Sequence, residues 1–129
     1  MIRLMVIDDE EDFSGLVRKY FSAMGCDVEV AASGESGLEK LAGTSADILI
    51  VDNRLPGIDG TEVVRRIRSA KKDVFIVMVT IDKEDEVKAA LYPFMVDRFL
   101  KKPFKFAELN DILIEMIALA RDRQKGHNR

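Results

Sequence analysis

Short apolar runs alternate with longer amphipathic stretches along the whole chain, and this alternation limits the folds that the chain can adopt. The runs at 4–7, 48–51 and 74–79 are almost continuously hydrophobic, which is typical of strands covered on both faces of a parallel sheet. The runs at 28–31 and 98–100 are partly alternating or very short, as edge strands tend to be. The pattern therefore predicts three central strands and two edge strands.

Amphipathic stretches with helical spacing follow these strands. The first stretch carries apolar residues at Phe13, Leu16, Val17, Tyr20, Phe21 and Met24, and Gly25 is a natural stop. The last stretch places Leu109, Ile112, Leu113, Met116, Ile117 and Ala120 on one face. Both stretches are predicted to be helices that pack an apolar face against the sheet.

Local signals also predict where the three helices between them begin or end. Ser33 is the expected cap of the second helix, and Asp59 with Glu62 gives the third helix a start that resembles a capping box. Asp82 is the expected cap of the fourth helix, and Pro93 prevents that helix from continuing far. The chain therefore consists of five consecutive strand and helix units.

Such repetition predicts an α/β fold in which a doubly wound parallel sheet has right-handed crossovers and helices on both faces. With 129 residues, of which 47% are apolar, the chain is long enough for one well-formed domain. In this architecture a ligand binds at the carboxyl ends of the strands, near the point where the strand order reverses. The functional residues are therefore expected directly after the strands.

Composition excludes several function classes. A net charge of -3 lacks the basic excess of a dedicated nucleic-acid binder, so no direct nucleic-acid ligand is expected. No apolar run approaches the roughly 20 residues of a membrane span, and a signal-peptide pattern is missing, so we expect a cytoplasmic protein without membrane contact. The single cysteine, Cys26, allows no internal disulfide, and the single histidine, His127, lies in a polar tail away from the expected site.

Acidic side chains gather where the first strand ends, in the stretch "LMVIDDEEDF" at 4–13. Neighbouring carboxylates repel one another unless solvent, a helix N-terminus or a cation offsets the repulsion. Taken alone, the first turn of a helix explains these acids better than a metal does. The side chains that follow the strands are those of Asp8 and Asp9, Asp52, Thr80, and Lys101 or Lys102. Acids from separate strands therefore converge on one edge of the predicted sheet.

The sequence resembles the receiver domain of two-component response regulators. The resemblance covers residues 2 to about 120 and depends on "IDDE" at 7–10, "VDNRLPGIDG" at 51–60, "VT" at 79–80 and "FLKKPF" at 99–104. It implies a flavodoxin-like (βα)5 three-layer sandwich whose five-stranded parallel sheet has the order 2-1-3-4-5. It also implies a receiver domain over 1–122 and a polar, basic tail or linker start over 123–129.

The same resemblance implies that Asp52 is the phosphoacceptor and that its carboxylate takes up a phosphoryl group with the help of Mg2+. Asp8, Asp9 and Asp52 would hold the ion together with the backbone carbonyl of Arg54, in line with the preference of Mg2+ for oxygen ligands. In this interpretation the acids cluster because they share a cation.

Further residues receive roles from the resemblance. Thr80 and Lys102 would bind the phosphoryl oxygens, and Lys102 is preferred over Lys101 because it directly precedes Pro103, with a cis bond between the two. Thr80 and Phe99 would form the switch, in which Phe99 turns inward when Thr80 moves toward the phosphoryl group. An ordinary core aromatic is an equally good interpretation of Phe99.

The resemblance also implies partners. A sensor histidine kinase or phosphotransfer protein would donate the phosphoryl group, and the face of the fourth helix, fifth strand and fifth helix would control a downstream output domain or protein. Dimerisation on phosphorylation is one form that such control takes in the family. No enzymatic activity is expected beyond self-catalysed phosphorylation and autodephosphorylation.

Two departures from the family pattern are expected to affect the site. Ile81 stands where the family usually has a small residue, and together with an ion pair between Arg54 and Asp82 it is expected to restrict access and slow dephosphorylation. The segment 91–99, "LYPFMVDRF", lacks the usual small turn before the fifth strand, which leaves the position of the fourth helix open.

Other function classes remain open at this stage. A magnesium-dependent phosphatase with an aspartyl nucleophile usually needs an aspartate pair of the form DxD, which is absent at both Asp8 and Asp52. The residues two positions on are Glu10 and Arg54, and only the acid Glu10 keeps this class open. An interaction domain that works without phosphate would not need the whole set of site residues. A flavin protein is disfavoured because acids replace the phosphate-binding loop after the first strand.

Overall fold

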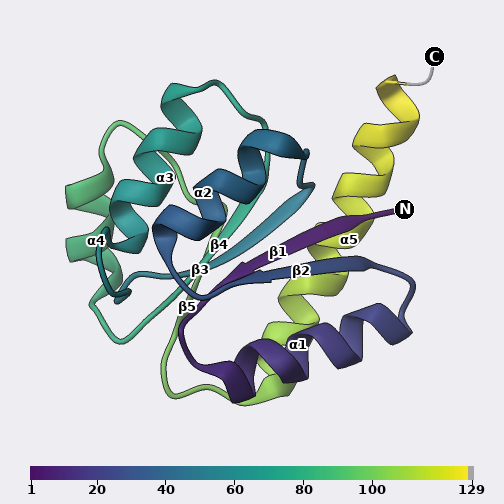
Figure 1. Cartoon of the computed structure of the whole chain (residues 1–129), viewed down its shortest axis with the longest axis horizontal. Coiled ribbons are helices and arrows are strands. Elements are labelled where there is room, and N and C mark those ends of the chain that lie inside the picture. The colour runs from purple at the N-terminus through teal and green to yellow at the C-terminus, as the bar shows by residue number, and fades with distance from the viewer. Residues whose placement is uncertain (128–129) are drawn as a thin grey trace.

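Figure 1 shows a sheet of parallel strands with helices packed on both faces, in a computed structural model that describes residues 1–127. The strands are β1 (Arg3–Ile7), β2 (Asp27–Ala31), β3 (Ile48–Asp52), β4 (Phe75–Thr80) and β5 (Arg98–Lys101). The helices are α1 (Glu11–Ala23), α2 (Gly34–Gly43), α3 (Gly60–Ser69), α4 (Glu84–Leu91) and α5 (Phe106–His127). Among these helices, none combines the length and the apolar character that crossing a bilayer requires.

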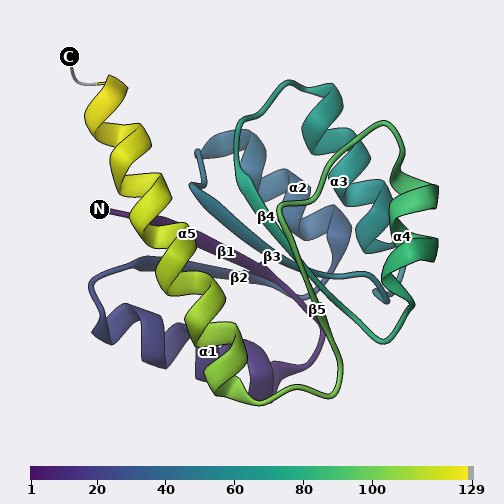
Figure 2. The ribbon, with the colours of Figure 1, turned by 180° about the vertical axis from the view of Figure 1, so that it is seen from behind.

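The strand order in the 5-stranded sheet is β2-β1-β3-β4-β5, and every neighbouring pair is parallel. This confirms the predicted order 2-1-3-4-5 and the predicted positions of the two edge strands. Helices α1 and α5 cover one face of the sheet, and α2, α3 and α4 cover the other (Figures 1 and 2). The strand order reverses between β1 and β3, so the carboxyl ends of these two strands are the expected ligand site.

Two apolar clusters fill the space between the sheet and its helices, one on each face. Successive residues of β1 alternate between them: Leu4 packs with Phe21 of α1, whereas Ile7 belongs to the opposite cluster. Burial on both faces explains why the central strands consist of almost continuous apolar residues. Helix α2 lies so close to the sheet that a Cβ atom on Gly37 would stand 2.7 Å from Cγ1 of Ile7.

Two of the three predicted helix caps are confirmed. The Ser33 side chain accepts a hydrogen bond from the backbone of Ser36, and the Asp59 side chain accepts one from the backbone of Glu62. The prediction for Asp82 was wrong: Lys83 precedes α4 and makes no side-chain cap. Asp82 does not cap α4 because its carboxylate is engaged with residues of two neighbouring loops, described below.

The apolar face predicted for α1 is wider than the face that the sheet covers. Val17 and Phe21 are fully buried, but Leu16, Tyr20 and Met24 are exposed. The sheet contacts only one side of the helix, and the ring of Tyr20 packs edge-on against Phe106 at the start of α5. A strip of apolar surface therefore remains on α1.

Helix α5 continues through the segment predicted to be a polar tail. Residues 123–127 belong to the helix, while residues 128–129 of that prediction lie outside the described part. The guanidinium of Arg123 lies 4.0 Å from the centre of the Phe75 ring and 3.1 Å from the Asp73 carboxylate. These contacts attach the C-terminal part of α5 to the start of β4.

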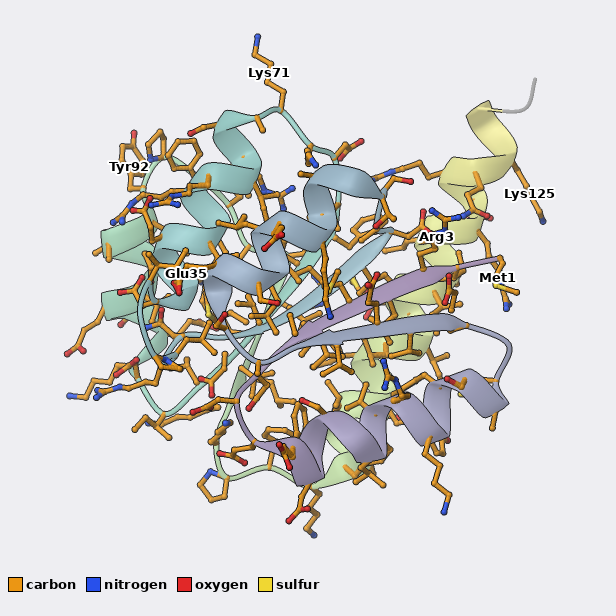
Figure 3. All side chains as sticks on the ribbon, in the orientation of Figure 1. Met1, Arg3, Glu35, Lys71, Tyr92 and Lys125 are labelled. Carbon is orange, nitrogen blue, oxygen red and sulfur yellow. The ribbon has the colours of Figure 1, made fainter. Side chains whose placement is uncertain are left out.

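The segment between α4 and β5, whose sequence is atypical, is fixed by contacts with α3 and β4. The Arg68 side chain donates hydrogen bonds to the backbone oxygens of Val74 and Met95. The Asp97 carboxylate accepts one from the backbone of Ile76. The Tyr92 side chain is 84% exposed and points away from the domain (Figure 3). The connecting segment is therefore held by polar contacts with α3 and β4, and it presents an aromatic side chain to solvent.

Candidate functional site

The carboxyl ends of β1 and β3 bring three acids together. Asp8 and Asp9 directly follow β1, and Asp52 is the last residue of β3. Their carboxylates each offer an oxygen within 4.8 Å of the others. Asp8 and Asp52 are buried, whereas Asp9 is exposed. The convergence predicted from the parallel sheet is thus present.

Of the three acids, Asp8 is the one whose carboxylate would be stabilised most by a bound cation. One of its oxygens accepts a hydrogen bond from the backbone of Glu10 at 2.8 Å, while Oδ2 is buried and accepts none among the described residues. Burial raises the pKa of Asp8 to about 6, against the opposing effects of the Glu10 backbone and the Lys102 charge. A buried carboxylate oxygen without a hydrogen bond, next to two other carboxylates, fits a hard divalent cation such as Mg2+.

Asp52 is held in a defined orientation by one bond to each carboxylate oxygen. Oδ1 accepts from the backbone N–H of Arg54 at 3.0 Å, and Oδ2 accepts from Nζ of Lys102 at 3.0 Å. Helix α3 begins close by, because a Cβ atom on Gly60 would collide with the backbone carbonyl of Asp52. The carboxylate of Asp52 is therefore buried and oriented, with the ammonium of Lys102 at hydrogen-bond distance.

Lys102 approaches all three of its acidic neighbours from the loop after β5. Its ammonium lies 3.0 Å from Asp52, 3.3 Å from Glu10 and 3.7 Å from Asp8. Burial disfavours the charged form, but the hydrogen bond to Asp52 and the nearby negative charges outweigh it and raise the pKa of Lys102. The bond between Lys102 and Pro103 is cis, as predicted. Lys102, not Lys101, is thus the lysine in the acidic cluster.

Thr80, the last residue of β4, is buried but does not hydrogen-bond to Asp52. Its hydroxyl donates to Oδ2 of Asp82 at 3.0 Å and accepts from the backbone N–H of Asp82, also at 3.0 Å. The structure therefore places Thr80 beside the site with its hydroxyl engaged by a neighbouring carboxylate.

The ion pair predicted between Arg54 and Asp82 is present. The Arg54 guanidinium donates through both Nη2 and Nε to Oδ1 of Asp82, with a closest distance of 2.6 Å. The hydrogen bonds from Arg54 and then Asn53 lower the pKa of Asp82 to about 2. Ile81, between Thr80 and Asp82 in sequence, is 55% exposed. These side chains form one rim of the site.

Phe99 of β5 lies away from the acids and is half-buried against the cluster beneath α3 and α4. The Lys88 ammonium stands 5.5 Å from the centre of its ring. Phe99 also lines an apolar groove together with Leu91, Tyr92 and Met95. The structure shows one position of this ring, and its inward turn stays a prediction.

The contacts of two further residues at the site, Asn53 and Glu10, were not predicted from the sequence. Asn53 donates to Oδ2 of Asp82 at 2.9 Å, and its side-chain oxygen accepts from both the backbone and the hydroxyl of Thr61. Glu10, which the sequence raised only as a loosely fitting phosphatase acid, contacts Lys102. The only available signal was their position directly after Asp52 and Asp9.

Comparison with known families and proteins agrees with the geometry. Residues 4–114 match the family described as the response regulator receiver domain. The chain is 34% identical over 120 residues to the response regulator MprA of Mycobacterium ulcerans, covering 93% of this chain and 50% of that protein. It is 32% identical over 108 residues to the alkaline phosphatase synthesis transcriptional regulatory protein PhoP of Bacillus subtilis, covering 84% and 45%. The chain thus spans about half the length of the curated relatives that it matches.

Solved structures of the same fold include a metal complex. The response regulator TrrA of Thermotoga maritima, solved in complex with Mg2+ and BeF, is 31% identical, with a TM-score of 0.76 over 90% of this chain and 99% of that one. A CheY-like receiver domain protein of Methanospirillum hungatei superposes with a TM-score of 0.86 at 21% identity, covering 95% of this chain and 98% of that one, which shows a common fold.

Proposed function

Since this chain belongs to the receiver domain family of two-component response regulators, we propose that Asp52 accepts a phosphoryl group from a partner histidine kinase or phosphotransfer protein. One observation carries the proposal: the buried Asp52 carboxylate lies close to the two acids after β1 and within hydrogen-bond distance of the ammonium of Lys102. The rest of the proposed site follows from the chemistry of that transfer.

In the proposed reaction an oxygen of the Asp52 carboxylate attacks the phosphorus atom of the donor. A bond between oxygen and phosphorus forms, the bond from phosphorus to the donor breaks, and its electron pair leaves with the donor. The backbone N–H of Arg54 and the ammonium of Lys102 orient the carboxylate beforehand. Lys102 then offers positive charge to the phosphoryl oxygens, and Thr80 offers its hydroxyl.

Asp8, Asp9 and Asp52 are the proposed side-chain ligands of Mg2+, and the backbone carbonyl of Arg54 is proposed to complete the protein's contribution. When bound, the ion supplies positive charge that reduces repulsion between the carboxylate and the phosphoryl oxygens. The buried Oδ2 of Asp8, which accepts no hydrogen bond from the described residues, supports this assignment. The Mg2+ and BeF complex of TrrA supports the same chemistry by similarity.

The proposed output is a shift in the face of α4, β5 and α5, in which Thr80 moves toward the phosphoryl group and Phe99 turns inward. Relatives named as transcriptional regulators are about twice as long as this chain, so an output domain or a separate protein is the proposed recipient of the signal. We propose no enzymatic role beyond phosphorylation of the domain's own Asp52 and loss of that phosphoryl group.

The proposal is tested by intact-protein mass spectrometry after incubation with acetyl phosphate and Mg2+. We expect one phosphoryl adduct on the chain without substitutions. We expect no adduct when EDTA removes the metal or when Asp52→Asn removes the nucleophile. Asp59→Asn is a matched control, because Asp59 is also an acid of the β3–α3 loop but caps α3 instead of facing the cluster.

Asp59→Asn should form the adduct at the rate of the unmodified chain. An adduct that persists in Asp52→Asn, or that forms equally well in EDTA, would overturn the assignment of Asp52 and the role of the metal, respectively.

A further inference from the structure

Asp82 is the centre of a hydrogen-bond cluster that joins the loop after β3 to the loop after β4. Its Oδ2 accepts from the Thr80 hydroxyl at 3.0 Å and from Nδ2 of Asn53 at 2.9 Å. Its Oδ1 accepts from Arg54, and its own backbone N–H donates to Oγ1 of Thr80. The Asp82 side chain is only 17% exposed, so these partners surround it.

The hydroxyl of Thr80 is committed by these contacts. A threonine hydroxyl has a single proton to donate, and here that proton points to Asp82. Thr80 itself is 2% exposed, so water does not offer an easy alternative partner. A phosphoryl oxygen on Asp52 can therefore gain a hydrogen bond from Thr80 only if Asp82 loses it.

We propose that Asp82 is a positioning residue that holds the Thr80 hydroxyl in the resting arrangement and competes for it with the phosphoryl group on Asp52. This inference rests on the proposed function, because it takes Thr80 as the residue that contacts the phosphoryl group. It differs from the access role expected for Asp82 from the sequence. The hydrogen bond to Thr80 acts on the unphosphorylated domain, and its effect does not depend on steric obstruction of the site.

The partners of Asp82 explain how it can release Thr80 without losing its own position. The Asn53 side-chain oxygen accepts two hydrogen bonds from Thr61, at 3.0 Å from the backbone and 2.6 Å from the hydroxyl. This fixes the amide so that its NH2 group faces Asp82. When Thr80 leaves, Asp82 keeps the bonds from Asn53 and Arg54, so the release breaks only the mutual contacts between Thr80 and Asp82.

Removing this competition should favour the switched arrangement by about tenfold, the lower end of the range for one hydrogen bond to a charged group. The test follows the methyl signals of Thr44, Thr61 and Thr80 by NMR in the unmodified chain and in Asp82→Ala. Beryllium fluoride with Mg2+ is the probe, and it defines the position of the Thr80 signal in the switched domain.

In Asp82→Ala without probe or metal, the Thr80 signal should move toward its probe-bound position. The concentration of beryllium fluoride needed for half-saturation at saturating Mg2+ should fall about tenfold. The Thr44 signal should stay unchanged, because Thr44 follows α2 and its hydroxyl bonds to the Lys40 backbone. An unchanged Thr44 signal also shows that the variant is folded.

Two further variants separate the contact with Thr80 from the ion pair. Arg54→Gln removes the charge partner of Asp82 but leaves the bond to Thr80, so the Thr80 signal without probe should stay near its resting position. Glu62→Ala removes another carboxylate that pairs with arginines, at Arg65 and Arg66, and should have no effect. Asp82→Ser, whose side chain is too short to reproduce the carboxylate contacts, is tested if Asp82→Ala does not fold.

The proposal is overturned if the Thr80 signal and the half-saturating probe concentration are the same in folded Asp82→Ala as in the unmodified chain. In that case the probe would still shift Thr80 in both proteins, so the proposed function would stand. If the probe shifts Thr80 in neither protein, the proposed function fails, and the competition for Thr80 fails with it.

Discussion

The ammonium of Lys102 lies 3.0 Å from Oδ2 of Asp52, although the two residues are 50 positions apart in the sequence. The parallel sheet produces this contact, because β3 and β5 both end at the edge where the acids gather. Lys102 thus places a positive charge within hydrogen-bond distance of the proposed phosphoacceptor.

Lys102→Met should slow phosphorylation by acetyl phosphate about 100-fold, because a charged group aimed at the developing negative charge is lost. Its Mg2+ affinity should rise, since the ammonium no longer competes for the carboxylates. The exposed neighbour provides the control: Lys101→Met should phosphorylate at nearly the normal rate. Equal rates in the two variants, followed by mass spectrometry, would contradict the role given to Lys102.

Asp8 should make the metal-free domain less stable as the pH rises. Its pKa is raised to about 6 in the folded chain, so its contribution to stability is full below about pH 4 and is lost as the pH rises through 6. Asp8→Asn should therefore raise the free energy of unfolding in EDTA at pH 7.5 by about 1–2 kcal/mol. Urea unfolding at several pH values measures this.

The gain from Asp8→Asn should shrink as the pH falls below 6, and Mg2+ should stabilise only the unmodified chain. Over the same range, the affinity of the unmodified chain for Mg2+ should fall as Asp8 takes up a proton. A stability gain that does not change with pH would show that the charge of Asp8 is not its cause.

Ile81→Ala should speed the loss of the phosphoryl group several-fold. The Ile81 side chain is 55% exposed beside Thr80, where it can obstruct water that approaches the aspartyl phosphate. The decay of phosphorylated protein is followed after the donor is removed. Ile114→Ala, which shortens an exposed side chain on α5, should decay at the normal rate. The same decay rate in Ile81→Ala and the unmodified chain rejects the access role of Ile81.

Two glycines inside helices should respond to alanine in opposite directions. A Cβ atom at Gly37 would press on the fully buried Ile7, so Gly37→Ala should lower the free energy of unfolding by about 1–3 kcal/mol. A Cβ atom at Gly15 meets nothing within 4 Å among the described residues, so Gly15→Ala should raise it by about 0.5–1 kcal/mol. Chemical denaturation measures both, and effects of the same sign would contradict the packing of α2 against β1.

The fold could be predicted because the burial of each strand determines its pattern of apolar residues. Strands β1 and β3 are covered on both faces and consist of apolar runs, so their central place could be inferred without a structure. The same reasoning overestimated the buried face of α1. An apolar residue such as Leu16 satisfies helical spacing whether or not the sheet reaches it.

Contacts at the site could be predicted only where strand ends determine them. Asp8 and Asp52 had to meet, because parallel strands that neighbour each other end at the same edge. Asp82 was misassigned as a helix cap because cap preference is a local property. Its contact with Arg54 was predicted, but its contacts with Asn53 after β3 and with Thr80 at the end of β4 depend on how the whole sheet places these two strand ends.

The central claim, that Asp52 is the residue that takes up the phosphoryl group, is tested most directly by locating the modification. Phosphorylated chain is treated with borohydride, which reduces an aspartyl phosphate to homoserine, and the peptides are sequenced by mass spectrometry. We expect homoserine at position 52 alone. Homoserine at Asp8 or Asp9 would contradict it, because the nucleophile would then lie after β1 and the acid at the end of β3 would have another role.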